Sequence, residues 1–315
     1  MAAAKLPDAE FVHLFRTLGA EAMSRQIGLN LRSVYDRRRS LERKLKITLT
    51  PPHHQRQPQV SELPGWINLE IPDGRVIIGG DAHIWPGPMS TAMRAFLAFI
   101  KEYKPKAVIL NGDVLDFPRI SRHAPIGWTS TPTPQQEIEA AQDQLHQIAK
   151  AAGRARKIWP IGNHDARFET KIASVLPELA KVVGSRLSDH FPLWECCWAT
   201  AINDDVVVKH KPPKGGMHSA RNSTLYAGKT TIANHLHSQI VAPFTDYRGD
   251  RWGVDSGCLA DVHHRAFLDY TEANPLNWRA GFCMLTFRGG RLLPPELATV
   301  LDADHITFRG EVIRV

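Results

Sequence analysis

The most constraining feature of this 315-residue chain is a series of short apolar runs, each followed at once by Asp, His or Asn. Between residues 66 and 237 these runs alternate with stretches of helical periodicity. Such alternation predicts an α/β sheet with right-handed crossovers. Ligands bind at the carboxyl ends of the strands in sheets of this kind. We therefore expect the polar residues that follow the runs to form one site.

These polar residues come after five runs. RVIIGG leads to Asp81 and His83, AVIL to Asn111 and Asp113, KIWPI to Asn163 and His164, VVVK to His210, and TTIAN to His235 and His237. Imidazole, carboxylate and amide groups suit borderline divalent transition metals. A carboxylate that bridges two ions about 3.5–4 Å apart gives a two-metal hydrolytic site. The glycines beside Asp113 and Asn163 allow the backbone to turn sharply near such a site.

The ordered set DxH, GDxxD, GNHD, a lone histidine and HxH resembles the calcineurin-like metallophosphoesterase family over roughly residues 66–260. Residues 255–258 (DSGC) and 278–282 (WRAGF) are also similar to phage-encoded members. The resemblance implies an α/β fold, a four-layer α/β/β/α sandwich with its site at the strand ends. It also implies a metal-dependent phosphoric ester hydrolase with two divalent metal ions, of which manganese is the first expectation and iron or zinc the alternatives.

The resemblance carries roles for individual residues. Asp81, His83 and His237 hold the first metal, Asp113 bridges both, and Asn163, His210 and His235 hold the second. A hydroxide at the bridging position is the implied nucleophile for in-line attack on phosphorus. His164 contacts the phosphate or protonates the leaving oxygen, and Asp116 orients His164. Such a dyad makes chemical sense because a carboxylate fixes the imidazole tautomer and raises its basicity.

Three positions depart from the family pattern. Asn234 replaces the glycine of the usual GHxH, and Lys211 follows the lone histidine where glycine is common. His218, in the stretch GGMHS, competes with His210 for the role of the lone histidine, although His210 ends an apolar run. Phe117 stands where the protein-phosphatase branch carries an arginine, which argues against that branch. The candidates for a phosphate contact are Arg119, Arg122, His123 and Arg167.

The first 50 residues predict a small all-α domain. We expect three helices, over residues 8–18, 20–27 and about 31–46. Gly19 and Gly28 separate them, and Asn30 is a good N-cap for the third. Val34, Tyr35, Leu41 and Leu45 form the apolar side of the third helix. The string GAEAMSRQIGLNLRSVYDRRRSLE resembles a helix-turn-helix motif.

The third helix is strongly basic. Residues 31–46 hold seven cationic side chains against two acidic ones, in a chain whose net charge is +7. A basic segment on a near-neutral body favours a polyanion partner, and we expect DNA rather than RNA. Arg32, Ser33, Asp36 and Arg37 are predicted to face bases, and Arg38, Arg39 and Arg43 to hold phosphates. The alternative is a helical cap or dimer element with a solvated basic face.

The domain boundaries follow from composition. Residues 1–50 form the helix-turn-helix-like domain, residues 51–65 a Pro-rich linker, and residues 66–315 the catalytic domain. The chain has no apolar run of about 18 residues and no apolar signal region at its N-terminus, so we expect a cytoplasmic protein without a membrane partner. Four cysteines without CxxC spacing predict reduced thiols.

Three functions are compatible with these features. The first is a phosphodiesterase, a nuclease that acts on DNA and uses the basic domain to hold its substrate. The second is a phosphatase or phosphodiesterase that acts on nucleotides or other small phosphoesters. The third is a DNA-binding regulatory protein with residual hydrolase activity.

Overall fold

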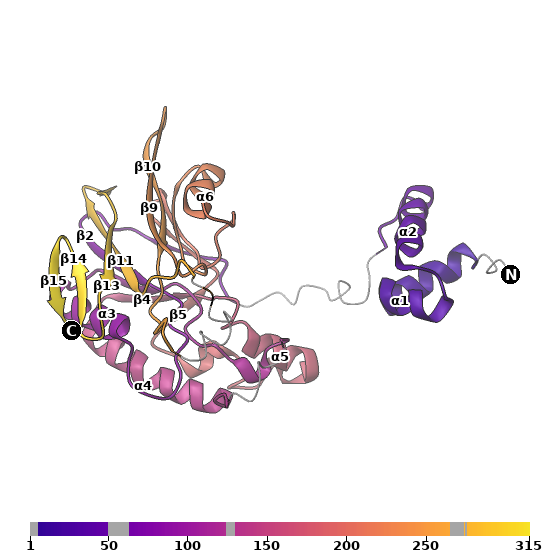
Figure 1. Cartoon of the computed structure of the whole chain (residues 1–315), viewed down its shortest axis with the longest axis horizontal. Helices are drawn as coiled ribbons and strands as arrows, with labels where there is room; N and C mark the ends of the chain where they lie inside the picture. The colour runs from indigo at the N-terminus through magenta and orange to yellow at the C-terminus, as the bar shows by residue number, and fades with distance from the viewer. Residues whose placement is uncertain (1–5, 50–62, 124–129, 265–273, 275) are drawn as a thin grey trace. The chain divides into compact units, whose positions relative to one another are not determined.

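The structure, a computed structural model, describes residues 6–49, 63–123, 130–264, 274 and 276–315 (Figure 1). The chain divides into two compact units, Met1–Glu62 and Leu63–Val315, which we call the helical unit and the two-sheet unit. Most of the expected linker, including His53 and His54, lies outside the described residues. No helix of the described residues is long and apolar enough to cross a membrane.

The helical unit contains α1 (Asp8–Ile27) and α2 (Leu31–Leu45). Gly19 has φ 77° and ψ 172° and breaks α1 into the two helical segments that the sequence predicts. The Asn30 side chain accepts a hydrogen bond from the Ser33 backbone N–H at 2.8 Å, which confirms the N-cap. The core of this unit consists of Phe11, Phe15, Ala20, Met23, Val34, Leu41 and Leu49.

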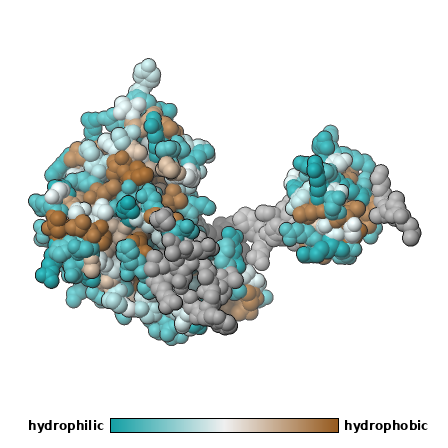
Figure 2. Space-filling view, viewed as in Figure 1, coloured by the Kyte–Doolittle hydropathy of each residue, from teal (hydrophilic) through white to brown (hydrophobic). Residues whose placement is uncertain are grey.

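The buried face of α2 is narrower than predicted. Val34 and Leu41, seven residues apart, are buried, whereas Tyr35 and Leu45 are 40% and 43% exposed. The placement of Tyr35 and Leu45 on the apolar side was therefore wrong, because α2 packs against α1 through a single stripe of side chains. Figure 2 shows a band of hydrophobic residues across the visible face of this unit.

The two-sheet unit is built from two mixed β-sheets. The six-stranded sheet has the order β1 (Trp66–Leu69), β6 (Ala199–Ile202), β7 (Val206–Val208), β8 (Thr230–Ala233), β10 (Gly249–Ser256) and β9 (Gln239–Asp246). The nine-stranded sheet has the order β15 (Glu311–Arg314), β14 (His305–Phe308), β13 (Glu296–Val300), β11 (Gly281–Arg288), β2 (Gly74–Gly79), β3 (Ala107–Leu110), β4 (Arg156–Pro160) and β5 (Glu195–Cys197), with β12 (Arg291–Leu292) paired to β11. Strands β2, β3, β4 and β5 are parallel neighbours.

Two cores define four layers. Val76 and Ile78 of β2 pack with Val208 and Ile232 in a core to which both sheets contribute. Ile77, between them in the sequence, faces the opposite side and packs with residues of α3 (Thr91–Tyr103) and α4 (Pro134–Ala152). The short helix α6 (Ser219–Ala227) packs on β8, β9 and β10 of the other sheet. The predicted α/β/β/α architecture is thus confirmed.

Local signals placed several elements correctly. The sequence TPQQ at residues 133–136 is a capping-box signal, and Thr133 forms that box with Gln136; Pro134 occupies the first turn of α4, and Gly153 ends that helix. The strands on either side of the Pro72–Gly74 turn do not pair with each other, since β1 belongs to the six-stranded sheet and β2 to the nine-stranded one. The four cysteines are buried and free, as expected.

Candidate metal centre

The five loops that follow β2, β3, β4, β7 and β8 come together at one place. Backbone hydrogen bonds join them: Asp81 N–H donates to the Gly112 carbonyl at 2.8 Å, and Asn234 N–H donates to the His210 carbonyl at 3.1 Å. The sequence prediction that these strand ends meet is therefore correct. The cluster contains residues from position 81 to position 237, so it is the fold that brings them together and not their spacing in the sequence.

Several side chains at this place lie on strained backbone. Asp81, His83, Asp113, His235 and His237 all have positive φ, between 42° and 74°. Residues with a Cβ avoid this left-handed region, and such strain persists only where the surrounding structure enforces it. Its concentration at the strand ends marks them as the candidate functional site.

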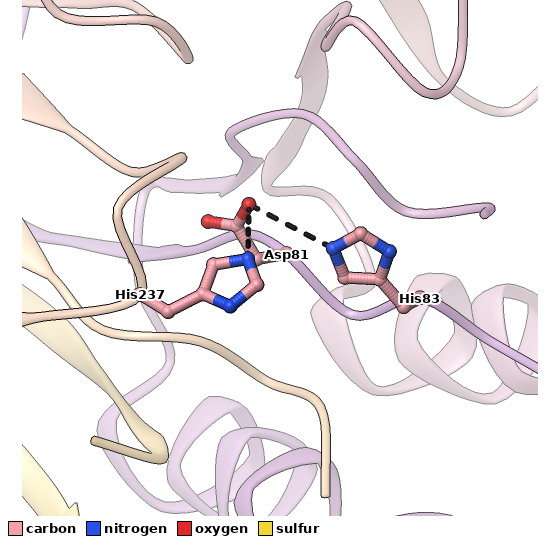
Figure 3. Close-up of side chains that lie close together, drawn as sticks. All are labelled: Asp81, His83 and His237. Atoms are coloured by element: carbon pink, nitrogen blue, oxygen red, sulfur yellow. Dashed lines mark ion pairs between the residues drawn. The ribbon is translucent and has the colours of Figure 1, made fainter. Parts of the chain in front are cut away.

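The first group of candidate ligands is Asp81, His83 and His237 (Figure 3). One ligand atom from each lies within 4.8 Å of the other two, and all three residues are buried. Asp81 Oδ1 is 3.2 Å from His237 Nε2 and 4.0 Å from His83 Nε2. This is the set that the family resemblance implies for the first metal.

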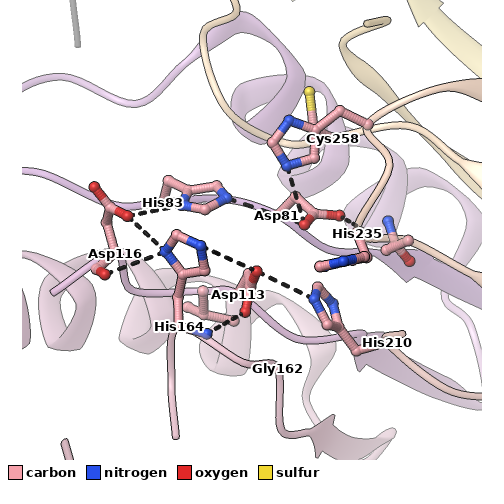
Figure 4. A network of polar contacts seen from close by, with 12 residues as sticks. Asp81, His83, Asp113, Asp116, Gly162, His164, His210, His235 and Cys258 are labelled. Carbon is pink, nitrogen blue, oxygen red and sulfur yellow. Dashed lines mark hydrogen bonds and ion pairs between the residues drawn. The ribbon is translucent and has the colours of Figure 1, made fainter. Parts of the chain in front are cut away.

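The second group is Asp113, His210 and His235 (Figure 4). Asp113 Oδ2 is 3.1 Å from His210 Nε2, and the rings of His210 and His235 are 5.2 Å apart. His218, the competitor for the lone histidine, is exposed at the start of α6. The structure therefore brings His210, and not His218, into the cluster.

A third group contains His83, Asp116 and His164. His164 Nδ1 lies 2.6 Å from Asp116 Oδ1, the contact that the dyad prediction requires. Arg167, the first residue of α5 (Arg167–Val175), donates a hydrogen bond to the Asp116 carbonyl at 2.6 Å and lies 3.1 Å from His164 Nε2. Of the four candidates for a phosphate contact, Arg167 is thus the one seen beside the dyad.

The donor set fits a metal ion. Asp81 Oδ1 and His210 Nε2 are buried. Their contacts with His237 Nε2 at 3.2 Å and Asp113 Oδ2 at 3.1 Å lack hydrogen-bond geometry, and no other hydrogen bond satisfies them among the described residues. Such atoms are costly unless something else satisfies them. Although burial works in the opposite direction, the charges of Asp113 and Asp81 raise the pKa of His210 to about 9. The cluster therefore favours a positive charge between its carboxylates and imidazoles, which is the field that a divalent cation needs.

Two glycines let the loops approach one another. A Cβ at Gly162 would collide with the backbone N and the carboxylate of Asp113, and one at Gly112, where φ is 80°, would collide with the His210 ring. These are the glycines of the GNHD and GDxxD motifs. The close approach that the sequence predicts beside Asp113 and Asn163 is present in the structure.

Asn163 is the one predicted metal ligand that is exposed and for which we observe no contact with the two ligand groups among the described residues. It follows Gly162 in the loop after β4, and its side chain is exposed. The next residues of that loop are anchored, since His164 N–H donates to Asp113 Oδ1 at 2.7 Å. The metal-ligand role of Asn163 stays a prediction.

Three buried polar residues support the site and were given no role from the sequence. Asp165 accepts hydrogen bonds from the Val114, Leu115 and Gly162 N–H groups and from the Trp159 ring N–H, at 2.9 to 3.1 Å. Glu137 of α4 accepts from the Asp116 and Phe117 N–H groups at 3.1 and 2.8 Å. Asn234 bridges the Asn111 side chain and the Gly257 carbonyl, both at 2.8 Å. Asp165 had a motif signal, as the last residue of GNHD, and Asn234 stood out only as the replacement for the glycine of GHxH.

The predicted nucleic-acid contacts of the helical unit separate into two sets. Arg37 binds the Leu6 carbonyl and Asp8 and lies over the Phe11 ring, and Arg38 pairs with Glu42 at 3.0 Å. Both are half-buried. Arg32, Arg39 and Arg43 are exposed, with Arg39 paired to Asp36 at 2.6 Å. Arg37 and Arg38 thus stabilise the helical unit itself.

Comparison with known sequences finds phage relatives. The chain is 26% identical over 263 residues to the Gene 54 protein of Mycobacterium phage D29. The matched region covers 72% of this chain and 94% of that protein. It is 22% identical over 250 residues to the Gene 54 protein of Mycobacterium phage L5, with the same coverage. The predicted likeness to phage-encoded proteins is confirmed by these two. No protein-family model matches the chain.

Solved structures with a similar arrangement include Vps29 complexed with zinc from Entamoeba histolytica, at 14% identity and a TM-score of 0.39 over 76% of this chain and 98% of that one. Another is a dimetal phosphatase from Danio rerio, at 9% identity and a TM-score of 0.37 over 77% and 98%. A third is YfcE, a phosphoesterase from E. coli, at 12% identity and 0.30 over 76% and 96%. Likeness at this level does not reveal a substrate. We therefore build the function on the residues of the site.

Proposed function

We propose that the two-sheet unit is a dinuclear-metal phosphodiesterase and that its substrate is DNA. The observation that carries the proposal is the pair of groups assembled at neighbouring strand ends, Asp81–His83–His237 and Asp113–His210–His235, in which only His235 is half-buried and the other five residues are buried. Two divalent ions held there would neutralise phosphate charge and activate water for in-line attack. Manganese suits this mixture of imidazole and carboxylate ligands, with iron or zinc as alternatives.

His164 and Arg167 supply the remaining chemistry. Asp116 holds His164 Nδ1, so that Nε2 is the ring nitrogen that faces Asp113 Oδ2, at 3.8 Å, and the Arg167 guanidinium, at 3.1 Å. Burial lowers the pKa of His164, but the charges and hydrogen bond of Asp116 and Asp113 outweigh it and raise the pKa above its usual value. An imidazole held by a carboxylate in this way is suited to transfer a proton to the leaving oxygen. The Arg167 guanidinium beside it is suited to bind a phosphate oxygen.

DNA is proposed because the helical unit resembles a helix-turn-helix and exposes Arg32, Arg39 and Arg43 on α2.

One feature favours a second candidate, hydrolysis of a nucleotide. A cleft of about 970 Å³ adjoins His83 and Asp116 and includes the side chains of Trp85 and Trp278. A cleft of that size accommodates a mononucleotide, and indole rings are suited to stack on a base.

The test is hydrolysis of end-labelled single-stranded and double-stranded DNA by the full-length chain with manganese, beside Asp113→Ala and with bis-p-nitrophenyl phosphate as a generic diester. We expect the wild type to cut DNA and the variant to be inactive on both substrates. Cleavage of the generic diester alone would remove DNA as the substrate and favour nucleotides. DNA retention by a wild type that hydrolyses neither would favour a regulatory binding protein.

A further inference from the structure

A second basic region, unrelated to α2, lies in the two-sheet unit. Residues 206–245 contain the five cationic residues Lys209, Lys211, Lys214, Arg221 and Lys229, and no Asp or Glu. The segment starts in β7, continues through His210 and α6, and then forms β8. After β8 it contains His235 and His237, the two histidines of the HxH motif. The segment thus carries five cations and no carboxylate although it includes three candidate metal ligands, and this distribution of charge needs a physical explanation.

The charges of this segment are not neutralised by carboxylates. Lys209, Lys211, Lys214 and Arg221 are exposed, and in the part of the chain that the structure describes none of them forms an ion pair. Lys229 has only a distant partner, Asp204 at 3.9 Å. We call Lys209, Lys211, Lys214 and Arg221 the basic surface. The three lysines lie within six residues of one another in the sequence, and like charges without an ion-pair partner raise the local positive potential, which attracts anions.

The basic surface adjoins the metal centre. Lys209 and Lys211 are the immediate neighbours of His210, whose ring is buried against Asp113. Consecutive Cα atoms lie about 3.8 Å apart, so both lysines begin within one residue of a candidate ligand. A polyanion bound by these lysines would run beside the loop after β7, which contributes His210 to the candidate metal centre.

The surface is held in place by α6. Ser219 Oγ donates to the Lys214 carbonyl at 2.7 Å, and Lys214 N–H donates to Ser223 Oγ at 3.3 Å. Helix α6 approaches β10 closely because Gly253 has no side chain; a Cβ there would collide with the Ala220 carbonyl. Arg251 of β10 donates to the Gly228 carbonyl, at the end of α6, at 2.9 Å. Because these contacts already order the backbone, binding of a ligand would lose little conformational entropy.

An exposed aromatic ring lies within the same surface. Lys214 Nζ is 4.4 Å from the centre of the Tyr226 ring, and Tyr226 is 69% exposed. Lys214 lies over one face of the ring, so a base would stack on the other face while the cation contacts phosphate. An exposed ring with a neighbouring cation is a combination that binds single-stranded nucleic acid. A paired base inside a duplex does not offer its face in this way.

We propose that the basic surface and Tyr226 bind single-stranded DNA and lead its backbone to the metal centre. The inference rests on the proposed function for the identity of the polyanion. It assigns to the two-sheet unit a contact surface of its own, independent of the helical unit. The strand lies along residues 209–226, with phosphates on the lysines and Arg221 and one base on Tyr226.

The test measures binding of a fluorescent 20-nucleotide single strand to the full-length chain in EDTA, at several salt concentrations. The variant K211Q/K214Q/R221Q removes three charges, and the control K101Q/K150Q/R288Q removes three exposed charges elsewhere in the same unit. We expect Kd to rise at least tenfold in the first variant and less than twofold in the control. The salt slope should fall by about 2, since each phosphate contact on a single strand contributes about 0.7.

Tyr226→Ala separates stacking from charge. We expect it to weaken binding of the single strand about tenfold, with the salt slope unchanged and a smaller effect on duplex. Thermal midpoints and manganese content show whether each variant is folded. Wild-type Kd and salt slope in a folded K211Q/K214Q/R221Q variant would overturn the proposal.

The two proposals fail in different ways. If the wild type cuts no DNA but K211Q/K214Q/R221Q still loses retention, the DNA-hydrolysis proposal fails and the basic surface stands. If the wild type cuts DNA and this variant binds and cuts it equally well, the basic surface fails and the hydrolysis proposal stands.

Discussion

The helical unit and the two-sheet unit both contain basic segments but use the charges differently. In α2, Arg37 and Lys44 pair with Asp8 and so join α2 to the start of α1, whereas Arg38 pairs with Glu42 within α2. In the two-sheet unit, Lys211 and Lys214 have no carboxylate partner among the described residues. A run of charges in a sequence therefore does not measure binding capacity; what matters is which charges the fold leaves without a partner.

The largest effect should separate catalysis from binding. Asp113→Ala removes the carboxylate beside His210 and should lower hydrolysis of bis-p-nitrophenyl phosphate about a thousandfold or more, and His83→Ala and Asn163→Ala should have similar effects. The control, R39Q/R43Q in the helical unit, should leave this rate unchanged. Steady-state rates with manganese test both. An Asp113→Ala variant with more than a tenth of the wild-type rate would place the chemistry elsewhere.

The next effect concerns the close approach of loops, which only the two-sheet unit uses at its site. A Cβ at Gly162 would collide with Asp113, so Gly162→Ala should displace that carboxylate and lower the rate about 30-fold. Gly65→Ala is a matched control because a Cβ there meets nothing within 4 Å. Rates and thermal midpoints of both variants check this, and equal rates would show that Gly162 is not needed for the geometry.

A third comparison is between two glutamates that bind backbone N–H groups. Glu42, near the surface of the helical unit, accepts from Leu49 at 2.8 Å, and its pKa is lowered. Burial raises the pKa of Glu137 to about 8. The folded chain therefore keeps a proton on Glu137 that the unfolded chain releases above about pH 4.5, and the free energy of unfolding should fall as pH rises from 4.5 toward 8.

Glu137→Gln should remove this pH dependence. Between pH 5 and pH 8 the wild type should lose roughly 3.5 kcal/mol of unfolding free energy that the variant keeps. All eight tryptophans lie at residue 66 or beyond, so their fluorescence in urea reports the two-sheet unit alone. Parallel pH profiles for wild type and variant would contradict a protonated Glu137.

The smallest effect is expected in the helical unit. Arg39 and Arg43 are exposed, and R39Q/R43Q should weaken binding of DNA by about two- to fivefold, less than the loss expected from the basic surface. Fluorescence anisotropy of the full-length variants makes the comparison directly. A larger loss from R39Q/R43Q than from K211Q/K214Q/R221Q would reverse the ranking of the two units.

The sequence predicted most where the signal is local or repeated. The Asn30 cap, the break at Gly19 and the Thr133 capping box depend on neighbours within a few residues, and all three are present. The meeting of the strand ends was predictable because parallel strands share an edge. The sequence did not indicate that β1 and β2 lie in different sheets, since pairing over long separations leaves no periodic trace.

The supporting residues of the site were the least predictable. Glu137 is one of several polar residues in α4, and only the fold shows that it binds the loop containing Asp116. The positive φ of Asp81 and His83 is likewise a property of the assembled loops. Tyr35 was misplaced because helical spacing gives the apolar stripe but not its width.

We propose that the two groups of candidate ligands in the two-sheet unit hold two divalent ions. The most direct measurement is the manganese content of the full-length chain after removal of metal with a chelator, reloading and desalting, beside Asp113→Ala. We predict two ions per wild-type chain and no more than one in the variant. A wild type that retains no manganese, iron or zinc would contradict the claim.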